Sequence, residues 1–237
     1  PNCSASASLS WTPDGREILF SGLRQNDWEY AWDESEVYAV SVKDGAVRQL
    51  THRKGPDGGP MVSPDGKLVA YIGRDWTDDT YKDEMLYVMG IDGANPRALT
   101  PNLDRTPTQL HWAADGGGVY FTCEDKGTRH LHFVSMSGQE RQLTQGNYIL
   151  SVTSIGKNGV AVGTLVSPSK PVDVVAFDIR NPQPKQLTAV NDDVLTDLKL
   201  GAVEEIWYTS VDNFKVQGWI VKPPDFDPKK KYPLMLS

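Results

Sequence analysis

The chain has 237 residues, long enough to bury a sizeable core, and carries 24 basic and 31 acidic residues for a formal charge of −7. A surface with this negative excess repels phosphate backbones and anionic lipids, so we expect no nucleic-acid partner and no membrane partner. Its two cysteines cannot form a disulfide framework, and its 21 glycines and 16 prolines indicate many turns and few long helices.

An internal repeat organises most of the chain. Each repeat opens with a turn motif before a short apolar run: residues 11–15, 62–66 and 112–116 end in Asp-Gly, and 157–159 is a degraded form. Each repeat closes on a Leu-Thr pair, and these pairs end at Thr51, Thr100, Thr144 and Thr188. A period of roughly 44 to 51 residues suits a propeller blade. The sequence therefore predicts an all-β fold, a partial β-propeller of about four blades of four antiparallel strands.

The blades are expected at about residues 8–51, 60–100, 108–144 and 149–188, then a partial closing segment, so that residues 1–200 form the propeller. In the first blade we place strands at 9–12, 17–21, 36–42 and 47–50. Pro-Asp-Gly suits the tight turns, because Pro presets one φ and Gly takes a positive one. One short helix is predicted at 192–198.

The loops of such blades sort by length to two ends of the molecule. The tight Asp-Gly turns are expected at one end, and the long connections at 23–35 and 74–84 at the other. Loops on a rigid scaffold often carry function. The end with the long connections is therefore the predicted face for partners or ligands.

The repeat stops after Thr188, and another pattern follows. Residues 203–210 and 216–222 are typical of a hairpin, and a Pro-rich stretch then leads to an apolar start at 234–237. A sheet that begins in this way leaves an edge that needs a partner. We interpret residues 201–237 as the truncated start of a second domain.

The Pro-Asp-Gly blades that end in Arg-Gln-Leu-Thr, together with the passages at 216–224 and 230–234, resemble the prolyl oligopeptidase family of serine peptidases. The acylaminoacyl-peptidase and dipeptidyl-peptidase V branch is the most similar. The resemblance implies a seven- or eight-bladed propeller followed by an α/β-hydrolase domain with a Ser-Asp-His triad. It identifies residues 201–237 as the first strands of that C-terminal α/β-hydrolase domain.

The resemblance assigns no catalytic residue to this chain. No serine lies in a Gly-x-Ser-x-Gly elbow and no His-Gly-Gly segment is present, so the chain alone is predicted to be inactive. The expected function is that of a propeller that restricts short peptides on their way to a missing catalytic domain, which would cleave them from the N-terminus. Short peptides, the missing blades and the missing domain are the implied partners, with oligomers possible. No cofactor and no metal are implied, and a periplasmic or secreted location is favoured over a cytoplasmic one.

Two other interpretations remain open. TolB-type propellers share the blade motifs, so the chain could be a non-enzymatic scaffold for protein–protein interaction. A carbohydrate- or lactone-processing propeller is a third possibility, and it requires carboxylates and histidines that converge on a central metal.

The candidate substrate-binding residue is Glu29, flanked by Trp28, Tyr30 and Trp32. A dipeptidyl peptidase must hold a free α-amino group, and a carboxylate between aromatic walls suits that task. The competing interpretation, which we favour, is a loop that caps the blade while its acids stay solvated.

Two further groups have candidate metal-ligand chemistry. Asp75, Asp78, Asp79, Asp83 and Glu84 supply oxygen ligands for Ca²⁺, but their spacing does not fit an EF-hand, and a solvated loop is favoured. His130 and His132 alternate on one predicted strand and share a face. We expect no acidic or cysteine neighbour to complete a site there, so packing or hydrogen bonding is the favoured role.

Overall fold

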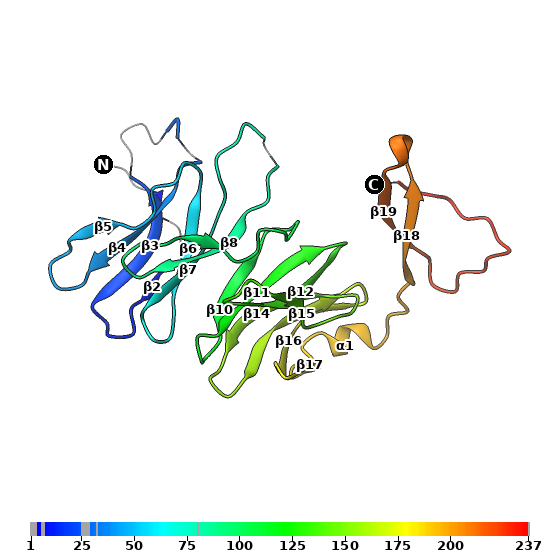
Figure 1. The fold of residues 1–237 in the computed structure, drawn as a ribbon. Coiled ribbons are helices and arrows are strands. Elements are labelled where there is room, and N and C mark those ends of the chain that lie inside the picture. The colour runs from blue at the N-terminus through cyan, green and yellow to red at the C-terminus, as the bar shows by residue number, and fades with distance from the viewer. Residues whose placement is uncertain (1–3, 6–7, 25–28, 32, 80, 237) are drawn as a thin grey trace.

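The computed structural model describes residues 4–5, 8–24, 29–31, 33–79 and 81–236. The regular secondary structure of this part is nearly all strand, with one α-helix, α1 (Asp192–Leu195), and one 3-10 segment, η1 (Val211–Asn213). The helix is shorter than the one predicted at 192–198. The sheets follow one another side by side and do not close into a ring (Figure 1). The prediction of an all-β partial propeller is confirmed.

The sequence repeats correspond to four antiparallel units of four strands each. In the first unit, the predicted strands lie within two residues of the observed ones, and β1 also pairs with β3. A parallel bridge between Arg129 and Ile149 joins the third and fourth units into one sheet. The strands are β1 (Ser4–Ala5), β2 (Ser10–Trp11), β3 (Glu17–Leu23), β4 (Glu36–Ser41) and β5 (Val47–Gln49); β6 (Asp57–Val62), β7 (Leu68–Gly73), β8 (Met85–Gly90) and β9 (Arg97–Ala98); β10 (Thr108–Trp112), β11 (Gly118–Asp125), β12 (Thr128–Ser135) and β13 (Glu140–Gln142); β14 (Ile149–Ile155), β15 (Val160–Ser167), β16 (Lys170–Asp178) and β17 (Asn181–Gln186).

The aspartate of each opening motif holds its turn together. Asp14 Oδ1 accepts hydrogen bonds from Thr12 Oγ1 at 2.6 Å and from the backbone N–H of Arg16 at 3.0 Å. Asp65 makes the same pair of contacts in the second unit. The glycine that follows Asp14 has a φ of +70°, which a side chain would disfavour. The motif therefore specifies the turn through both its side chains and its backbone.

The closing Leu-Thr pair of each repeat fastens the fourth strand of a unit to its third strand. The leucine N–H donates to a strand carbonyl, and the threonine Oγ1 accepts a hydrogen bond from the N–H of the same residue at 2.8 to 2.9 Å. We call this arrangement the Leu-Thr hook. The hooks are Leu50-Thr51 on Val37, Leu99-Thr100 on Leu86, Leu143-Thr144 on Leu131 and Leu187-Thr188 on Val174.

We expect Thr100→Ala to lower the free energy of unfolding by about 1–3 kcal/mol, because Leu86 is fully buried and its N–H loses its acceptor. Urea denaturation measures the change. Thr100→Ser keeps the hydroxyl and should retain most of the stability. Equal losses in the two variants would contradict a role for the hydrogen bond.

The core is divided into three apolar clusters, one at each junction between successive units. The first lies between units one and two and contains Leu19 and Tyr71; the second, between units two and three, contains Leu99 and Phe121. The third contains Leu131 and fills the junction with unit four. The middle units are therefore apolar on both faces, because each is covered on both sides.

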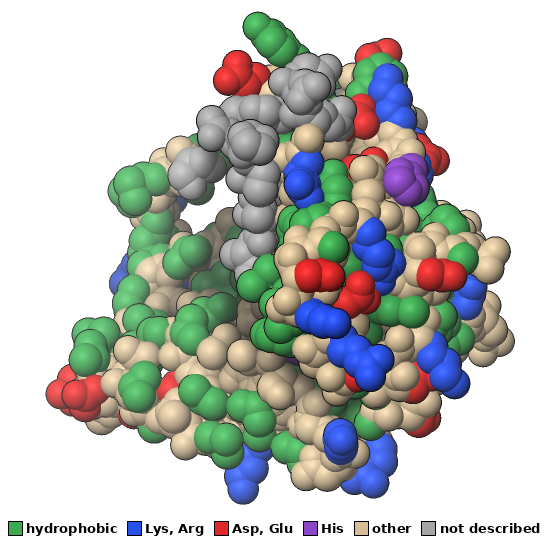
Figure 2. Space-filling view, turned by 90° about the vertical axis from the view of Figure 1, so that its left-hand side faces the viewer, with side chains coloured by type: hydrophobic (Ala, Val, Ile, Leu, Met, Phe, Trp, Pro, Cys, Tyr) green, Lys and Arg blue, Asp and Glu red, His purple; other side chains and the backbone are tan. Residues whose placement is uncertain are grey.

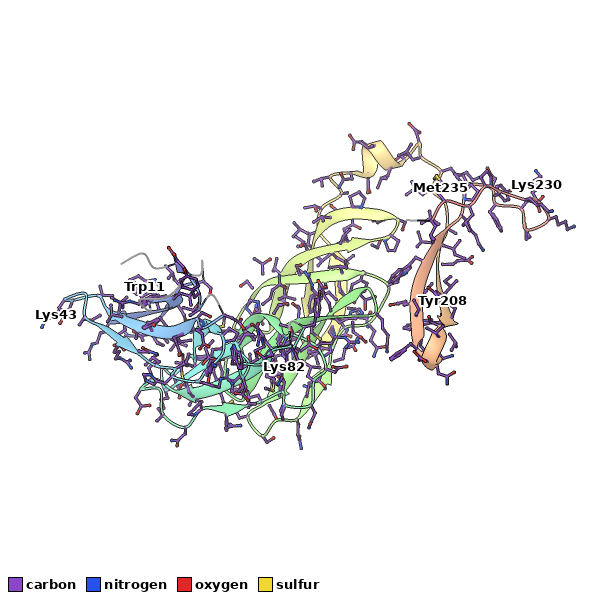
Figure 3. The ribbon with its side chains drawn as sticks, turned by 90° about the horizontal axis from the view of Figure 1, so that it is seen from above. Trp11, Lys43, Lys82, Tyr208, Lys230 and Met235 are labelled. Atoms are coloured by element: carbon purple, nitrogen blue, oxygen red, sulfur yellow. The ribbon has the colours of Figure 1, made fainter. Side chains whose placement is uncertain are left out.

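Trp112 shows how neighbouring units are joined. Its side chain is 8% exposed, packs in the second cluster and donates from Nε1 to the carbonyl of Met61 at 2.9 Å. Trp11 occupies the same place in the repeat of the first unit but is 56% exposed. Figure 3 shows Trp11 at the first-unit end of the molecule, near Lys43 and far from Tyr208.

The last two strands, β18 (Val203–Thr209) and β19 (Lys215–Val221), pair only with each other in the described structure. The hairpin stands to one side of the sheets, beyond α1 (Figure 1). Neither helix of the described residues has the length and apolar character that a bilayer crossing requires.

Candidate functional site

The connection between β5 and β6 lies between the long loops of the first two units. The N–H of Gly55 donates to Glu34 Oε2 at 3.2 Å, and the N–H of Trp76 donates to the carbonyl of Lys54 at 2.9 Å. The N–H of Asp57 donates to the carbonyl of Ser35 at 2.7 Å. These bonds bring the 23–35 and 74–84 connections together at one end. The tight Asp-Gly turns of units one and two lie around a separate cavity, which none of the long connections lines in the described structure.

Gly55 makes this junction possible. Its φ is +118°, and a Cβ there would lie 2.3 Å from the carbonyl oxygen of Arg74 and 2.6 Å from the N of Trp76. No other residue fits a backbone approach this close. The glycine therefore lets the two loops pass in contact.

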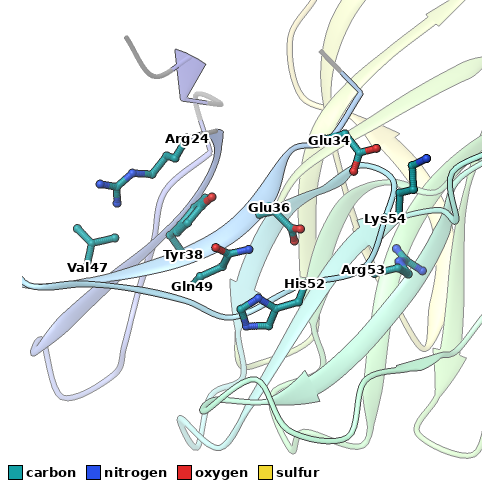
Figure 4. A pocket seen from close by; sticks show the side chains of 9 residues that line it. All are labelled: Arg24, Glu34, Glu36, Tyr38, Val47, Gln49, His52, Arg53 and Lys54. Carbon is teal, nitrogen blue, oxygen red and sulfur yellow. The ribbon is translucent and has the colours of Figure 1, made fainter. Parts of the chain in front are cut away.

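A pocket of about 660 Å³ opens beside this junction. Figure 4 shows Arg24 and Val47 on one side, Arg53 and Lys54 on the other, and Glu36 between them. Its lining residues are Arg24, Glu34, Glu36, Tyr38, Val47, Gln49, His52, Arg53 and Lys54. The first-unit flank carries acidic and basic side chains interspersed, without a field of one sign (Figure 2).

Glu36 is the buried acid of this pocket, and the residue is 7% exposed. Thr51 Oγ1 donates to Glu36 Oε2, and the same hydroxyl accepts from the N–H of Val37 at 2.8 Å. Burial raises the pKa of Glu36 to about 7, and the nearby Asp57 and Glu34 carboxylates raise it further, against the hydrogen bond from Thr51. Glu36 can therefore exchange a proton near neutral pH.

Arg53 lines the pocket and forms an ion pair with Asp57, which is buried behind it. Asp57 is fully buried, and Arg53 Nη2 donates to its Oδ1 while Arg53 Nη1 lies 3.4 Å from Asp75. The Arg53 guanidinium also stacks 4.1 Å from the ring centroid of Tyr87. Burial raises the pKa of Asp57 to about 6, and the Arg53 charge opposes that rise. The ion pair holds the Arg53 guanidinium in place at the edge of the pocket.

The pocket is suited to binding and not to acyl transfer. Among the described residues that line it there is no serine, threonine or cysteine to act as a nucleophile. Charges of both signs surround the cavity, so they can orient a ligand that carries both an ammonium and a carboxylate or carbonyl group.

Of the predicted substrate residues that the structure describes, Glu29 and Tyr30 do not line this pocket. Glu29 and Tyr30 are both exposed, Tyr30 at 88%, and Trp28 and Trp32 lie outside the described residues. Tyr30 instead borders a neighbouring cavity of about 360 Å³ with Arg74. A role for Glu29 stays a prediction.

Acidic side chains of the loop at 75–84 contact other residues of the same chain. Asp75 pairs with Arg53, and Asp83 Oδ1 accepts a hydrogen bond from Thr106 Oγ1 at 3.1 Å. In the part of the chain that the structure describes, no group of three or more His, Cys, Asp or Glu residues is arranged to hold a metal ion.

The structure shows the surroundings of the histidine pair. His130 and His132 are both buried on β12, and His132 has an acidic and a cysteine neighbour that the sequence pattern did not reveal. His132 Nδ1 lies 2.6 Å from Glu140 Oε1, and its Nε2 lies 3.3 Å from Cys123 Sγ. The neighbours contact opposite ring nitrogens, so the three groups do not converge on one point where a metal could bind.

The Cys123–His132–Glu140 order is that of a nucleophile, a base and an orienting acid, yet its burial prevents that chemistry. Cys123 is 2% exposed, and burial raises the pKa of its thiol to about 11. The thiol therefore stays protonated and inaccessible at neutral pH. The cluster packs and hydrogen-bonds within the third unit.

Glu36, Arg53 and Asp57 are functional candidates that the sequence motifs do not single out. Asp57 lies in Gly-Pro-Asp-Gly-Gly at 55–59, a composition typical of an exposed turn. Glu36 directly precedes an apolar run. A charged residue at the first position of a buried strand was the available signal.

Comparison with known proteins places this fold. No family model matches the chain. Dipeptidyl-peptidase 5 of Porphyromonas gingivalis is 29% identical over 233 residues, which is 96% of this chain and 34% of that protein. The acylaminoacyl peptidase of Pyrococcus horikoshii superposes with a TM-score of 0.73 at 21% identity, over 98% of this chain and 34% of that one. TolB of Acinetobacter baumannii superposes with a TM-score of 0.61 at 19% identity, over 78% and 43%.

These likenesses define the class first: a propeller of the kind found in TolB and in peptidases. Over nearly its whole length the chain is similar to prolyl oligopeptidase-family peptidases, so the resemblance found in the sequence is confirmed. The chain spans about a third of the length of the relative from P. gingivalis. It is the peptidase-family propeller region that the similarity covers.

Proposed function

We propose that the chain is the propeller-side portion of a serine peptidase that cleaves short peptides from the N-terminus, as a dipeptidyl- or acylaminoacyl-peptidase. The propeller acts as a steric filter in front of the catalytic domain, and residues 201–237 begin that domain. The similarity to dipeptidyl-peptidase 5 along 96% of the chain is the observation that carries the proposal. The open two-stranded sheet of β18 and β19 supports it, since such a hairpin is marginal alone and needs further strands.

The competing scaffold function has less support. TolB superposes on 78% of the chain and the acylaminoacyl peptidase on 98%, so TolB leaves about a fifth of the chain without a counterpart. Both neighbours are consistent with the propeller itself. The greater coverage by the acylaminoacyl peptidase favours the peptidase function.

The test compares the 237-residue chain with the full-length gene product. Chromogenic dipeptidyl and acetyl–amino acid substrates are assayed with each, and we expect hydrolysis only by the full-length protein. The full-length protein should also cleave a dipeptidyl substrate far faster than the N-terminus of a folded polypeptide, because a steric filter excludes the latter. Hydrolysis by the 237-residue chain alone, or equal rates on short and folded substrates, contradicts the proposal.

Glu29 is proposed as the group that holds the free α-amino group of the substrate. In the full-length protein, Glu29→Gln should raise KM for free-amino substrates by roughly tenfold and leave acetylated substrates unchanged, because only the former lose a charged contact. An unchanged KM for free-amino substrates removes Glu29 from the proposed site.

A further inference from the structure

The tip of the β11–β12 hairpin touches the C-terminal hairpin at two points. Gln217 Nε2 donates to the carbonyl of Lys126 at 2.9 Å. At Gly127, a Cβ would lie 2.3 Å from Cζ2 of Trp219 and 2.7 Å from its Cη2, so the indole packs directly on the glycine backbone. Among the described residues, the bond from Gln217 is the one hydrogen bond between the hairpin and the four units.

The turn that makes these contacts has an unusual backbone. Lys126 has a φ of +49° and Gly127 a φ of +71°. Two positive φ values are typical of the tight two-residue turn that fits the strand twist, but its first position favours Asn, Asp or Gly over Lys. A lysine held in this conformation is strained. In this conformation the Lys126 carbonyl can accept the hydrogen bond from Gln217, and the Gly127 backbone is accessible to the Trp219 indole.

We propose that the β11–β12 turn is a docking site for the C-terminal hairpin, and that Gly127, Trp219 and Gln217 position the hairpin on the third unit. The covalent tether between them does not do this. Residues 187–202 are exposed for the most part, and α1 within them has no buried residue. If the hairpin begins a catalytic domain, the same contact fixes how the propeller meets that domain. This consequence rests on the proposed function.

The chain offers a matched pair of glycines for the test. Gly116 and Gly127 both have a φ of +71°, but a Cβ at Gly116 meets nothing within 4 Å. Asparagine tolerates this φ better than other side chains. Gly127→Asn therefore preserves the turn and places a side chain where Trp219 packs, while Gly116→Asn applies the same backbone change without a collision.

The 237-residue chain is labelled with 5-fluorotryptophan, and the ¹⁹F resonance of Trp219 is assigned with Trp219→Phe. In Gly127→Asn, we expect that resonance to move toward its position in urea. Limited proteolysis within 187–202 should accelerate by roughly tenfold, since the docked hairpin no longer restrains the tether. Gly116→Asn should match the parent chain in both measurements. Identical behaviour of the two asparagine variants overturns the proposal.

Two hairpin variants keep the test decisive if Gly127→Asn fails to fold. Trp219→Leu and Gln217→Met change only exposed or half-buried side chains outside the four units. Each should raise the cleavage rate within 187–202, and unchanged cleavage in both overturns the proposal. Because neither measurement uses peptidase activity, the outcome does not depend on the assay of the proposed function.

Discussion

Arg53→Met is expected to lower the free energy of unfolding by about 3–5 kcal/mol, because it leaves the fully buried Asp57 carboxylate without its partner. Asp57 Oδ2 has no hydrogen-bond partner in the described structure, and the Arg53 guanidinium is the cation that offsets the burial of this carboxylate. Urea denaturation at pH 8 measures the change. The loss should be smaller at pH 5, since removal of the guanidinium raises the pKa of Asp57 further and its neutral form needs no cation.

Arg180→Met is the matched control. Arg180 pairs with Asp178 through two hydrogen bonds, but its side chain is 75% exposed. Exposed ion pairs contribute little to stability because both charges stay solvated, so this variant should remain close to the parent chain. Adding Asp57→Asn to Arg53→Met should restore part of the stability. Equal effects of the Arg53 and Arg180 changes would show that burial of the pair does not matter.

Glu36→Gln is expected to remove a pH-dependent loss of stability. The pKa of Glu36 is about 7 in the folded chain against 4.5 in the absence of that environment, so the folded state binds the proton more tightly. Its contribution is full below pH 4.5 and is lost as pH rises to 7. Relative to Glu36→Gln, the parent chain should lose up to about 3 kcal/mol across that range.

Glu17→Gln serves as the control, because the stability difference between the parent chain and this variant should change with pH in the opposite direction. The hydrogen bonds from Arg48 hold the pKa of Glu17 below its usual value. That contribution is present above pH 4.5 and is lost as the pH falls below it. Denaturation series from pH 3 to 8 on the three proteins separate the two signs. If the stability of the parent chain and that of Glu36→Gln change with pH in parallel, burial does not raise the pKa of Glu36.

The repeat was predictable because its signals are local. The Asp14 turn and the Leu-Thr pairs each act within a single unit, and their side chains hydrogen-bond to nearby backbone. The pocket was not predictable, because the burial of Asp57 depends on how two units pack. A turn composition at 55–59 concealed it, and only the structure shows the ion pair with Arg53.

The histidine cluster shows a second limit. Its members were considered along one strand, whereas Cys123 and Glu140 lie on the strands to either side of β12. Both reach His132 diagonally across the sheet, so their meeting depends on strand register. The spacing of residues in a sequence does not contain that register. Glu29, by contrast, was prominent in the sequence because of its aromatic neighbours, and it stays a prediction.

The three separate apolar clusters have a consequence for how the molecule loses structure. Opening the first unit exposes one cluster, whereas opening the second exposes two, because the second unit contributes side chains to both. Free energies of local opening should therefore differ along the chain, with slow amide exchange in β7, β8, β11 and β12 and faster exchange in the first and fourth units. Resistance to opening is then a property of position in the row, and a given Leu-Thr hook protects its strand more strongly in the middle than at either margin.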